Sequence, residues 1–217
     1  MEAEIITQEE KQEQAVTVVE QAAKTAVNVW TDPAQFNQLL RAANMLSQTN
    51  IIPEAYRGKP ADCFVAAEMA SRMGVSPMVV MQNMYVVKGK PSWAGQACTM
   101  LINSCGKFKD VKHIYTGEKG TDNRGCHVTA TRISDGEQIN GVEVTMQMAK
   151  AEGWTSNPKW RNMPELMLAY RASAFFARVY CPEALMGVQT AEEIYDVEAA
   201  QTGHKKTDDL TAILKGE

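Results

Sequence analysis

The sequence predicts an α+β fold in which a helical framework packs around a small antiparallel β section. Three observations predict it. Several segments carry apolar side chains at helical spacing, a middle stretch is rich in β-forming residues, and 45% of the 217 residues are hydrophobic, which is enough to bury a core. The two ends are acidic and polar and lack a strong apolar pattern. We therefore expect a flexible, partly helical acidic segment at 1–30, a core at 31–200, and a linker with a short tail at 201–217.

The helices are predicted from their start and stop signals. Asp32 or Thr31 can cap the first helix, and Pro33 suits its first position. Gly74 is placed to end the second helix, and Thr190-Ala-Glu-Glu193 resembles a capping box that begins the last one. The predicted helices span residues 33–49, 61–73, 77–84, 93–105, 146–152, 164–180 and about 190–200.

The β section is predicted from β-branched and aromatic residues and from turn signals. Residues 85–87 form a strand that turns through Lys88-Gly-Lys-Pro91, and 108–115 alternates in part. Residues 126–133 are rich in β-formers and are followed by a turn at 134–136. We expect residues 142–145 to return from that turn as the partner strand.

The charge distribution matters more than the total. The net charge of −4 is unfavourable for a protein that binds nucleic acid. However, residues 54–180 carry 16 basic and 11 acidic side chains, whereas the segments on either side are acidic. Because affinity for phosphate depends on local charge, a basic middle between acidic ends is compatible with nucleic-acid binding.

The predicted helix 164–180 carries the most informative pattern. Arg171, Phe175 and Arg178 share one stripe, and the two arginines are about 10 Å apart along the axis. Neither arginine has an Asp or Glu three or four residues away, so local ion pairing does not neutralise them, although carboxylates distant in sequence remain an alternative. Two cations around a ring suit the backbone and bases of single-stranded DNA. The neighbouring stripe is the predicted core face, formed by Met163, Leu166, Met167, Tyr170, Ala174 and Ala177.

Two further groups combine cations with aromatic rings. Lys159-Trp160-Arg161 precedes the long helix on a predicted loop, and Trp160 could stack on DNA bases. The alternative is a hydrophobic plug over the helix start, with Arg161 pairing with Glu165. The turn at 85–93 adds Lys88 and Lys90, with a solvated turn and a core Trp93 as its alternative.

Other chemistries lack a matching pattern. The five cysteines are scattered, so Cys126 and His127 are expected to be a buried thiol and a strand histidine rather than metal ligands. No nucleotide-binding P-loop or hydrolase motif occurs. A metal-dependent nuclease using Glu68, Asp110 or Glu143 and an interaction module without DNA contact remain the rival functions. The polar N-terminus and the lack of an apolar run of about 20 residues predict a cytoplasmic protein without a membrane span.

The order of several motifs resembles one known family. The stretch from Trp160 to Arg178, followed by Pro182–Gly187 and Ala191–Ile194, resembles the RecT/Redβ superfamily of phage recombinases. The upstream order agrees with it, since Ala66–Gly74 precedes the hairpin and Trp93–Ile102 follows. The resemblance covers about residues 33–197.

This resemblance implies a RecT/Redβ-like annealing core that acts without ATP. Such proteins bind single-stranded DNA, anneal complementary strands, and assemble as rings and helical filaments with DNA in a basic groove between subunits. It implies no catalytic residue and no cofactor beyond Mg²⁺ as a modulator. A phage 5′–3′ exonuclease and the host single-strand DNA-binding protein are implied partners, in a bacterial host cell. The expected DNA-binding residues are Lys88, Lys90, Lys159, Trp160, Arg161, Arg171, Phe175 and Arg178. Glu165 departs from the family pattern, because a relative has a lysine there.

Overall fold

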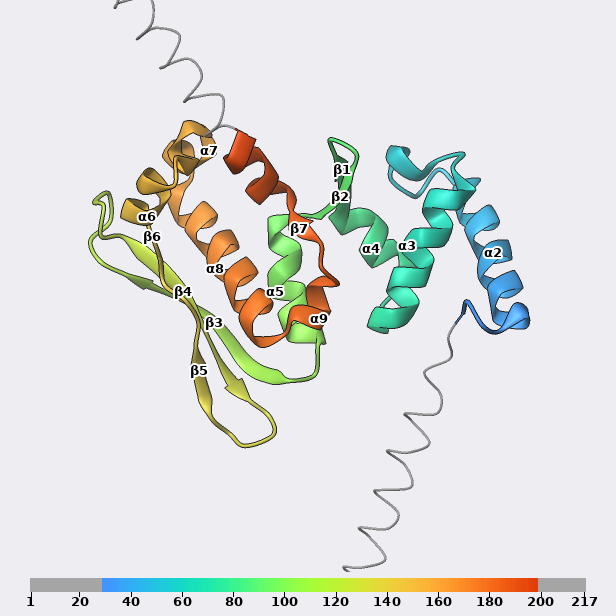
Figure 1. Ribbon diagram of the computed structural model, residues 1–217, viewed down its shortest axis with the longest axis horizontal. Helices are drawn as coiled ribbons and strands as arrows, with labels where there is room; N and C mark the ends of the chain where they lie inside the picture. The colour runs from blue at the N-terminus through green and yellow to red at the C-terminus, as the bar shows by residue number, and fades with distance from the viewer. Residues whose placement is uncertain (1–28, 199–217) are drawn as a thin grey trace, which may run out of the picture. The chain divides into compact units, whose positions relative to one another are not determined.

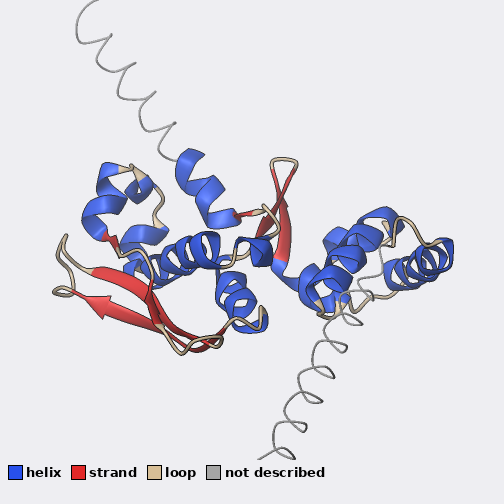
Figure 2. Cartoon of the chain, turned by 60° about the horizontal axis from the view of Figure 1, so that its bottom comes forward, coloured by secondary structure: helices blue, strands red, loops and turns tan. Residues whose placement is uncertain are grey.

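The computed structural model describes residues 29–198, which divide into two compact units, 29–72 and 73–198 (Figure 1). Helices and small sheets coexist in the second unit, which confirms the α+β class (Figure 2). The expected acidic end segments, the linker and the tail lie almost wholly outside the described residues. No single described helix is long and apolar enough to cross a membrane, although the helices Pro60–Met73 and Pro77–Asn83 satisfy that criterion as a bent pair.

The first unit consists of α2 (Pro33–Ser47), the 3-10 helix η1 (Glu54–Tyr56) and α3 (Pro60–Met73). Asp32 caps α2 as predicted, since its side chain accepts hydrogen bonds from the backbone N–H of Ala34 at 2.9 Å and of Gln35 at 3.3 Å. The rings of Trp30, Phe36 and Phe64 form an aromatic cluster between α2 and α3, with centroids 5.1–6.0 Å apart. This cluster joins the two helices of the unit.

The second unit begins with a helix and a small sheet. α4 (Pro77–Asn83) leads into β1 (Met84–Val87), which pairs antiparallel with β2 (Lys90–Trp93). The two turn residues Lys88 and Gly89 have φ of 51° and 77°, as a two-residue hairpin of the right twist requires. β7 (Gln189–Thr190) adds to β2 in parallel. Trp93 is fully buried, as its core alternative predicted.

The larger sheet has the order β3-β4-β5, with β6 also paired to β4. Its strands are β3 (Phe108–Thr116), β4 (Gly125–Arg132), β5 (Gln138–Asn140) and β6 (Val144–Thr145). The prediction that 142–145 is the partner strand is confirmed in part, because Val144–Thr145 pairs antiparallel with β4, but these residues do not follow the turn directly. Residues 138–140 occupy that position, because the short turn already brings Gln138 opposite Thr131. β6 pairs instead with the other end of β4, where Val144 faces Cys126.

The remaining helices cover one face of this sheet. They are α5 (Gly95–Ser104), α6 (Met146–Ala151), the 3-10 helix η2 (Trp154–Ser156), α7 (Lys159–Asn162), α8 (Pro164–Tyr180) and α9 (Pro182–Leu185), followed by a helical segment at 191–198. α8 lies between α5 and the sheet (Figure 1).

The burial of α8 confirms part of its predicted core face, since Met167, Ala174 and Ala177 are buried, and corrects the rest. Met163 and Leu166 are 42% and 41% exposed, whereas Leu168 and Arg171 on the neighbouring stripe are buried. Packing against both α5 and the sheet buries more of the helix circumference than one amphipathic stripe predicts.

Candidate nucleic-acid interface

Arg171 lies in the interior of the second unit. Its side chain is 7% exposed and bonds through Nη2 to Asp196, with Nη1 3.7 Å from Glu193 Oε1. The guanidinium carbon also lies 4.0 Å from the centroid of the Trp154 ring. A guanidinium placed between two carboxylates and an aromatic face is compensated in both charge and packing.

Arg178 shares one of these carboxylates. Its Nη1 and Nη2 donate to Glu193 Oε1 and Oε2 at 2.7 and 2.5 Å, and its side chain remains 40% exposed. Glu193 also accepts from the backbone N–H and hydroxyl of Thr190 at 2.9 and 3.0 Å. Thr190 Oγ1 accepts from the Glu193 N–H in return, which confirms the predicted capping box. Burial acts to raise the pKa of Glu193, but the bonds from Arg178 and Thr190 outweigh it and hold that pKa below its usual value.

Carboxylates distant in sequence therefore neutralise both arginines, which is the alternative that the sequence left open. We call Arg171, Arg178, Glu193 and Asp196 the ionic cluster. The expectation of an exposed arginine stripe was wrong for Arg171, because segment 191–198 covers it. Contact of Arg171 or Arg178 with DNA stays a prediction and would require these ion pairs to open.

Trp160 is also withdrawn from the surface. It lies on α7 rather than on a loop, is fully buried, and packs against Trp154 with centroids 5.5 Å apart. Phe175 also packs against Trp154, at 6.4 Å. Trp160 is therefore a hydrophobic plug, which confirms the alternative interpretation. The prediction that its ring is exposed and stacks on DNA bases was wrong, because the ring packs inside the protein.

The proposed pairing of Arg161 with Glu165 was wrong. Glu165 instead pairs with Lys119 at 3.1 Å and with Arg124 at 2.5 Å. Hydrogen bonds from Lys119 and then from Arg124 lower the pKa of Glu165. Glu165, which departs from the family pattern, therefore neutralises Lys119 and Arg124. Arg161 takes no part in this pairing and is exposed.

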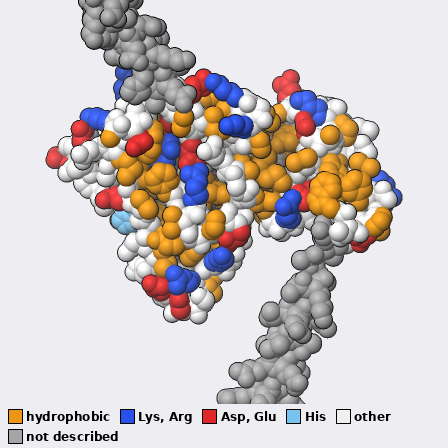
Figure 3. Space-filling model, viewed as in Figure 1, with side chains coloured by type: hydrophobic (Ala, Val, Ile, Leu, Met, Phe, Trp, Pro, Cys, Tyr) orange, Lys and Arg blue, Asp and Glu red, His pale blue; other side chains and the backbone are white. Residues whose placement is uncertain are grey.

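Few cations of the second unit remain unneutralised. On the face in Figure 3, basic and acidic side chains are interspersed rather than segregated. Lys88 pairs with Glu198. Five exposed cations form no salt bridge with any residue of the described range, namely Lys90, Lys109, Lys112, Lys159 and Arg161.

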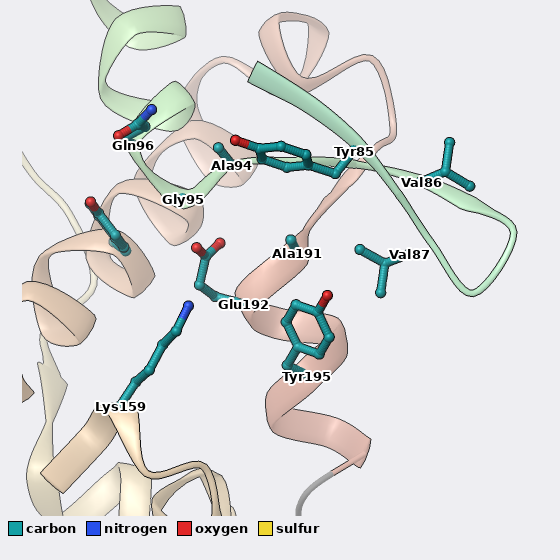
Figure 4. Close-up of a pocket in the computed structure, with 11 residues that line it drawn as sticks. Tyr85, Val86, Val87, Ala94, Gly95, Gln96, Lys159, Ala191, Glu192 and Tyr195 are labelled. Carbon is teal, nitrogen blue, oxygen red and sulfur yellow. The ribbon is translucent and has the colours of Figure 1, made fainter. Parts of the chain in front are cut away.

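One of these cations, Lys159, lines a cleft of about 480 Å³. Strand β1 and the start of α5 supply one side, and α7, α8 and segment 191–198 supply the other (Figure 4). The lining is formed by Tyr85, Val86, Val87, Ala94, Gly95, Gln96, Lys159, Tyr170, Ala191, Glu192 and Tyr195. The cleft thus combines aromatic rings, a cation and polar groups in one concave site.

The cleft depends on a glycine at the start of α5. A Cβ atom at Gly95 would lie 2.7 Å from Tyr170 Cδ2 and 3.0 Å from Glu192 Oε2, both closer than ordinary contact allows. No side chain caps α5, because the preceding residue is Ala94. The first-turn N–H groups of α5 therefore face the cleft region with the positive end of the helix dipole.

Sequence reasoning missed most of this cleft. It assigned Tyr170 to the core face, named Tyr85 only as an aromatic residue of the hairpin, and did not single out Gln96, Glu192 or Tyr195. The available signal was the exposure of two tyrosines, Tyr85 on a polar hairpin and Tyr195 beside acidic residues. Their proximity depends on the fold and is invisible in one sequence.

Within the described range 29–198, no group of three or more His, Cys, Asp or Glu residues is placed to hold the metal ion of a nuclease. Glu68 pairs with Arg72, and Glu143 accepts a hydrogen bond from Thr116. Cys126 is buried, and burial raises the pKa of its thiol to about 11, as expected for a buried thiol in the strand.

Comparison with known proteins gives one match. A family model described as the RecT family matches residues 38–208. No curated protein matches the chain, and no solved structure does. The matched range contains the cleft and the ionic cluster.

Proposed function

The chain belongs to the RecT family of single-strand DNA annealing proteins, and from this premise we propose that it pairs complementary strands without ATP and without bond-making chemistry. The observation that carries the proposal is the cleft. Lys159 lies in it, Lys90 extends from the hairpin beside it, and Arg161 follows on α7. These cations have no salt-bridge partner in the described part of the chain, so they are available to phosphates.

Binding of single-stranded DNA in this cleft would combine two contributions. The cations neutralise phosphates and release counterions, which gives affinity that falls as salt rises. The exposed rings of Tyr85 and Tyr195, at 51% and 47% exposure, offer stacking surfaces that accept any base. The free energy for annealing then comes from base pairing between the two strands.

The assembly and the partners are part of the same proposal. Self-association would align the clefts of neighbouring subunits along one strand, as a ring or a helical filament, and would hold the annealed duplex intermediate. We further propose that the protein acts in the cytoplasm of a bacterial host, with Mg²⁺ as a modulator, and cooperates with a phage 5′–3′ exonuclease and the host single-strand DNA-binding protein.

The test is annealing of two complementary oligonucleotides without ATP, followed together with particle size. The wild-type chain should accelerate pairing at low salt and form larger particles on DNA. Lys159→Ala should slow annealing several-fold. Lys150→Ala is the matched control, because Lys150, on α6, pairs with Asp122 and lies outside the cleft.

Each rival function predicts a different result in the same assay. A metal-dependent nuclease would fragment the labelled strands when Mg²⁺ or Mn²⁺ is added. An interaction module without DNA contact would give no mobility shift at any salt concentration. Either result would contradict the annealing proposal.

A further inference from the structure

The polar groups of the cleft are arranged for more than phosphate binding. Tyr85 and Tyr195 lie across the pocket from one another, and the carboxylate of Glu192 projects between them and Lys159 (Figure 4). The volume of about 480 Å³ lies within the usual range of small-molecule sites. A flat ring that enters between the two tyrosines would therefore reach the carboxylate.

Glu192 is the distinctive group of this site. Its Oε2 is buried and accepts no hydrogen bond from any described residue. A buried acceptor without a donor is costly, so it marks a place where a ligand can donate a hydrogen bond. Lys159 Nζ points toward this carboxylate in Figure 4, but the two form no salt bridge within 4.0 Å.

We propose that the cleft is a nucleobase pocket that takes one base per subunit out of the bound strand and selects a base with an exocyclic amino group. The base stacks on Tyr85 or Tyr195, its amino group donates to the Glu192 carboxylate that lines the cleft, and the adjacent phosphate lies near Lys159. This inference rests on the proposed binding of single-stranded DNA and adds selectivity to it.

Cytosine and thymine give the sharpest contrast. Cytosine presents an amino group at N4, which a carboxylate accepts, whereas thymine presents the O4 acceptor at the same position. A carboxylate facing O4 is repelled and remains without a donor. The pocket therefore favours cytosine over thymine, although the two rings have nearly the same size and stacking.

One base held in this way would fix the strand in each subunit. The neighbouring bases remain open to a complementary strand, while the held base prevents the strand from sliding. Gly95 supports this geometry, because an added Cβ would displace Tyr170 and Glu192 from their positions at the pocket.

The experiment compares oligo(dC) with oligo(dT) of equal length by fluorescence anisotropy, using the full chain. Wild type should bind oligo(dC) about tenfold more tightly. Glu192→Gln should reduce the difference to about twofold or less, because the amide loses the charge and can present an N–H. Glu152→Gln is the matched control, since Glu152 is exposed at the end of α6 and outside the cleft. Tyr195→Leu should weaken both oligonucleotides and is a second variant that keeps apolar bulk.

Equal affinity of wild type for oligo(dC) and oligo(dT) would overturn the pocket, as would a preference that survives Glu192→Gln. If wild type binds neither oligonucleotide, the proposed function itself is refuted. A competition arm uses dCMP to identify the source of the base. No displacement of oligo(dC) by millimolar dCMP is expected, and efficient displacement would show a site for free nucleotides rather than for a base within a strand.

Discussion

The ionic cluster and the cleft lie in the same unit and use cations in opposite ways. Arg171 and Arg178 are held by Glu193 and Asp196, so their charge is used inside the protein. Lys159 lines an open cleft without a salt bridge to any described residue. The comparison teaches that the cations most prominent in a sequence pattern need not be the ones available to a ligand. The following predictions, from the largest expected effect to the smallest, test this division.

Removal of Asp196 should produce the largest loss of stability. Asp196→Ala leaves Arg171 buried with only the more distant Glu193, and breaking such a buried pair costs about 3–5 kcal/mol. Urea unfolding measures the loss. Asp135→Ala is the control, because its partner Arg132 is exposed and such a pair contributes about 0–1 kcal/mol. Equal losses of stability in the two variants would contradict the predicted difference between a buried ionic cluster and a surface ion pair.

Removal of the cleft cation Lys159 together with its exposed neighbour Arg161 on α7 should reduce DNA affinity without a comparable loss of stability. The double variant Lys159→Ala with Arg161→Ala should bind single-stranded DNA about tenfold more weakly at low salt. The slope of log affinity against log salt should become shallower by about 1.4, or roughly 0.7 for each lost phosphate contact. A salt titration by anisotropy measures both quantities.

Arg178 provides the counter-test to that variant. Sequence reasoning expects Arg178→Ala to weaken DNA binding without unfolding. The structure predicts a stability cost as well, because Glu193 would lose the two hydrogen bonds from Arg178. If Arg178→Ala makes the salt dependence of DNA binding shallower and leaves the stability unchanged, Arg178 belongs to the DNA-binding surface rather than to the ionic cluster.

As the pH falls, the protein should lose stability first through His113 and only at lower pH through Glu193 of the ionic cluster. Burial lowers the pKa of His113, whose Nε2 lies 2.7 Å from Ser173 Oγ between β3 and α8. The unfolded chain binds this proton near pH 6.5, so the stabilisation is fully present above that value and is lost as pH falls through the lowered folded pKa. Glu193 behaves alike at lower pH, beginning below 4.5.

Thermal unfolding of wild type and His113→Gln between pH 7.5 and 5 measures the histidine contribution. The variant should lose part of the acid sensitivity in this window, because it lacks the group whose pKa burial lowers. His127→Asn serves as a control for replacing a histidine in the same sheet. An identical pH dependence in wild type and His113→Gln would contradict the assignment.

The smallest expected effect is a difference in DNA affinity between variants of Lys88 and Lys90, the two lysines of the β1–β2 hairpin. Lys88 pairs with Glu198 and occupies a turn position with φ of 51°, whereas Lys90 has no salt bridge with a described residue. Lys90→Ala should weaken DNA binding two- to threefold, and Lys88→Gly should change it less. Lys88→Gly should also leave stability unchanged or slightly higher, because glycine adopts this turn without strain. A larger DNA effect at Lys88 would reverse this ranking.

Local features of the fold followed from the sequence. The cap at Asp32, the hairpin at 84–93, the capping box at Thr190 and the limits of α8 each depend on neighbouring residues, and all were predictable. The strand at 138–140 was not, because Gln-Ile-Asn carries little β signal and pairs through the turn that precedes it.

The site was less predictable than the fold for a related reason. The carboxylates that neutralise Arg178 and Arg171 lie 15 and 25 residues away in sequence, beyond any helical spacing rule. The cleft likewise joins residues from 85 to 195. Among the predicted cations, Lys88, Lys90, Lys159, Arg161 and Arg178 are exposed, but only Lys90, Lys159 and Arg161 form no salt bridge within the described range, and their contact with DNA stays a prediction.

The capping box at Thr190 has a consequence for how this protein can vary. It sets the rotational phase of segment 191–198, in which Glu193 and Asp196 face the interior and Glu192 and Tyr195 face the cleft. Each residue of a helix turns by about 100°. Inserting or deleting one residue after the cap would therefore rotate the following residues by about 100° and move Glu193 and Asp196 away from the two arginines. A substitution such as Glu192→Gln changes only one side of this segment, whereas a change in its length would disturb the interior and the binding surface together.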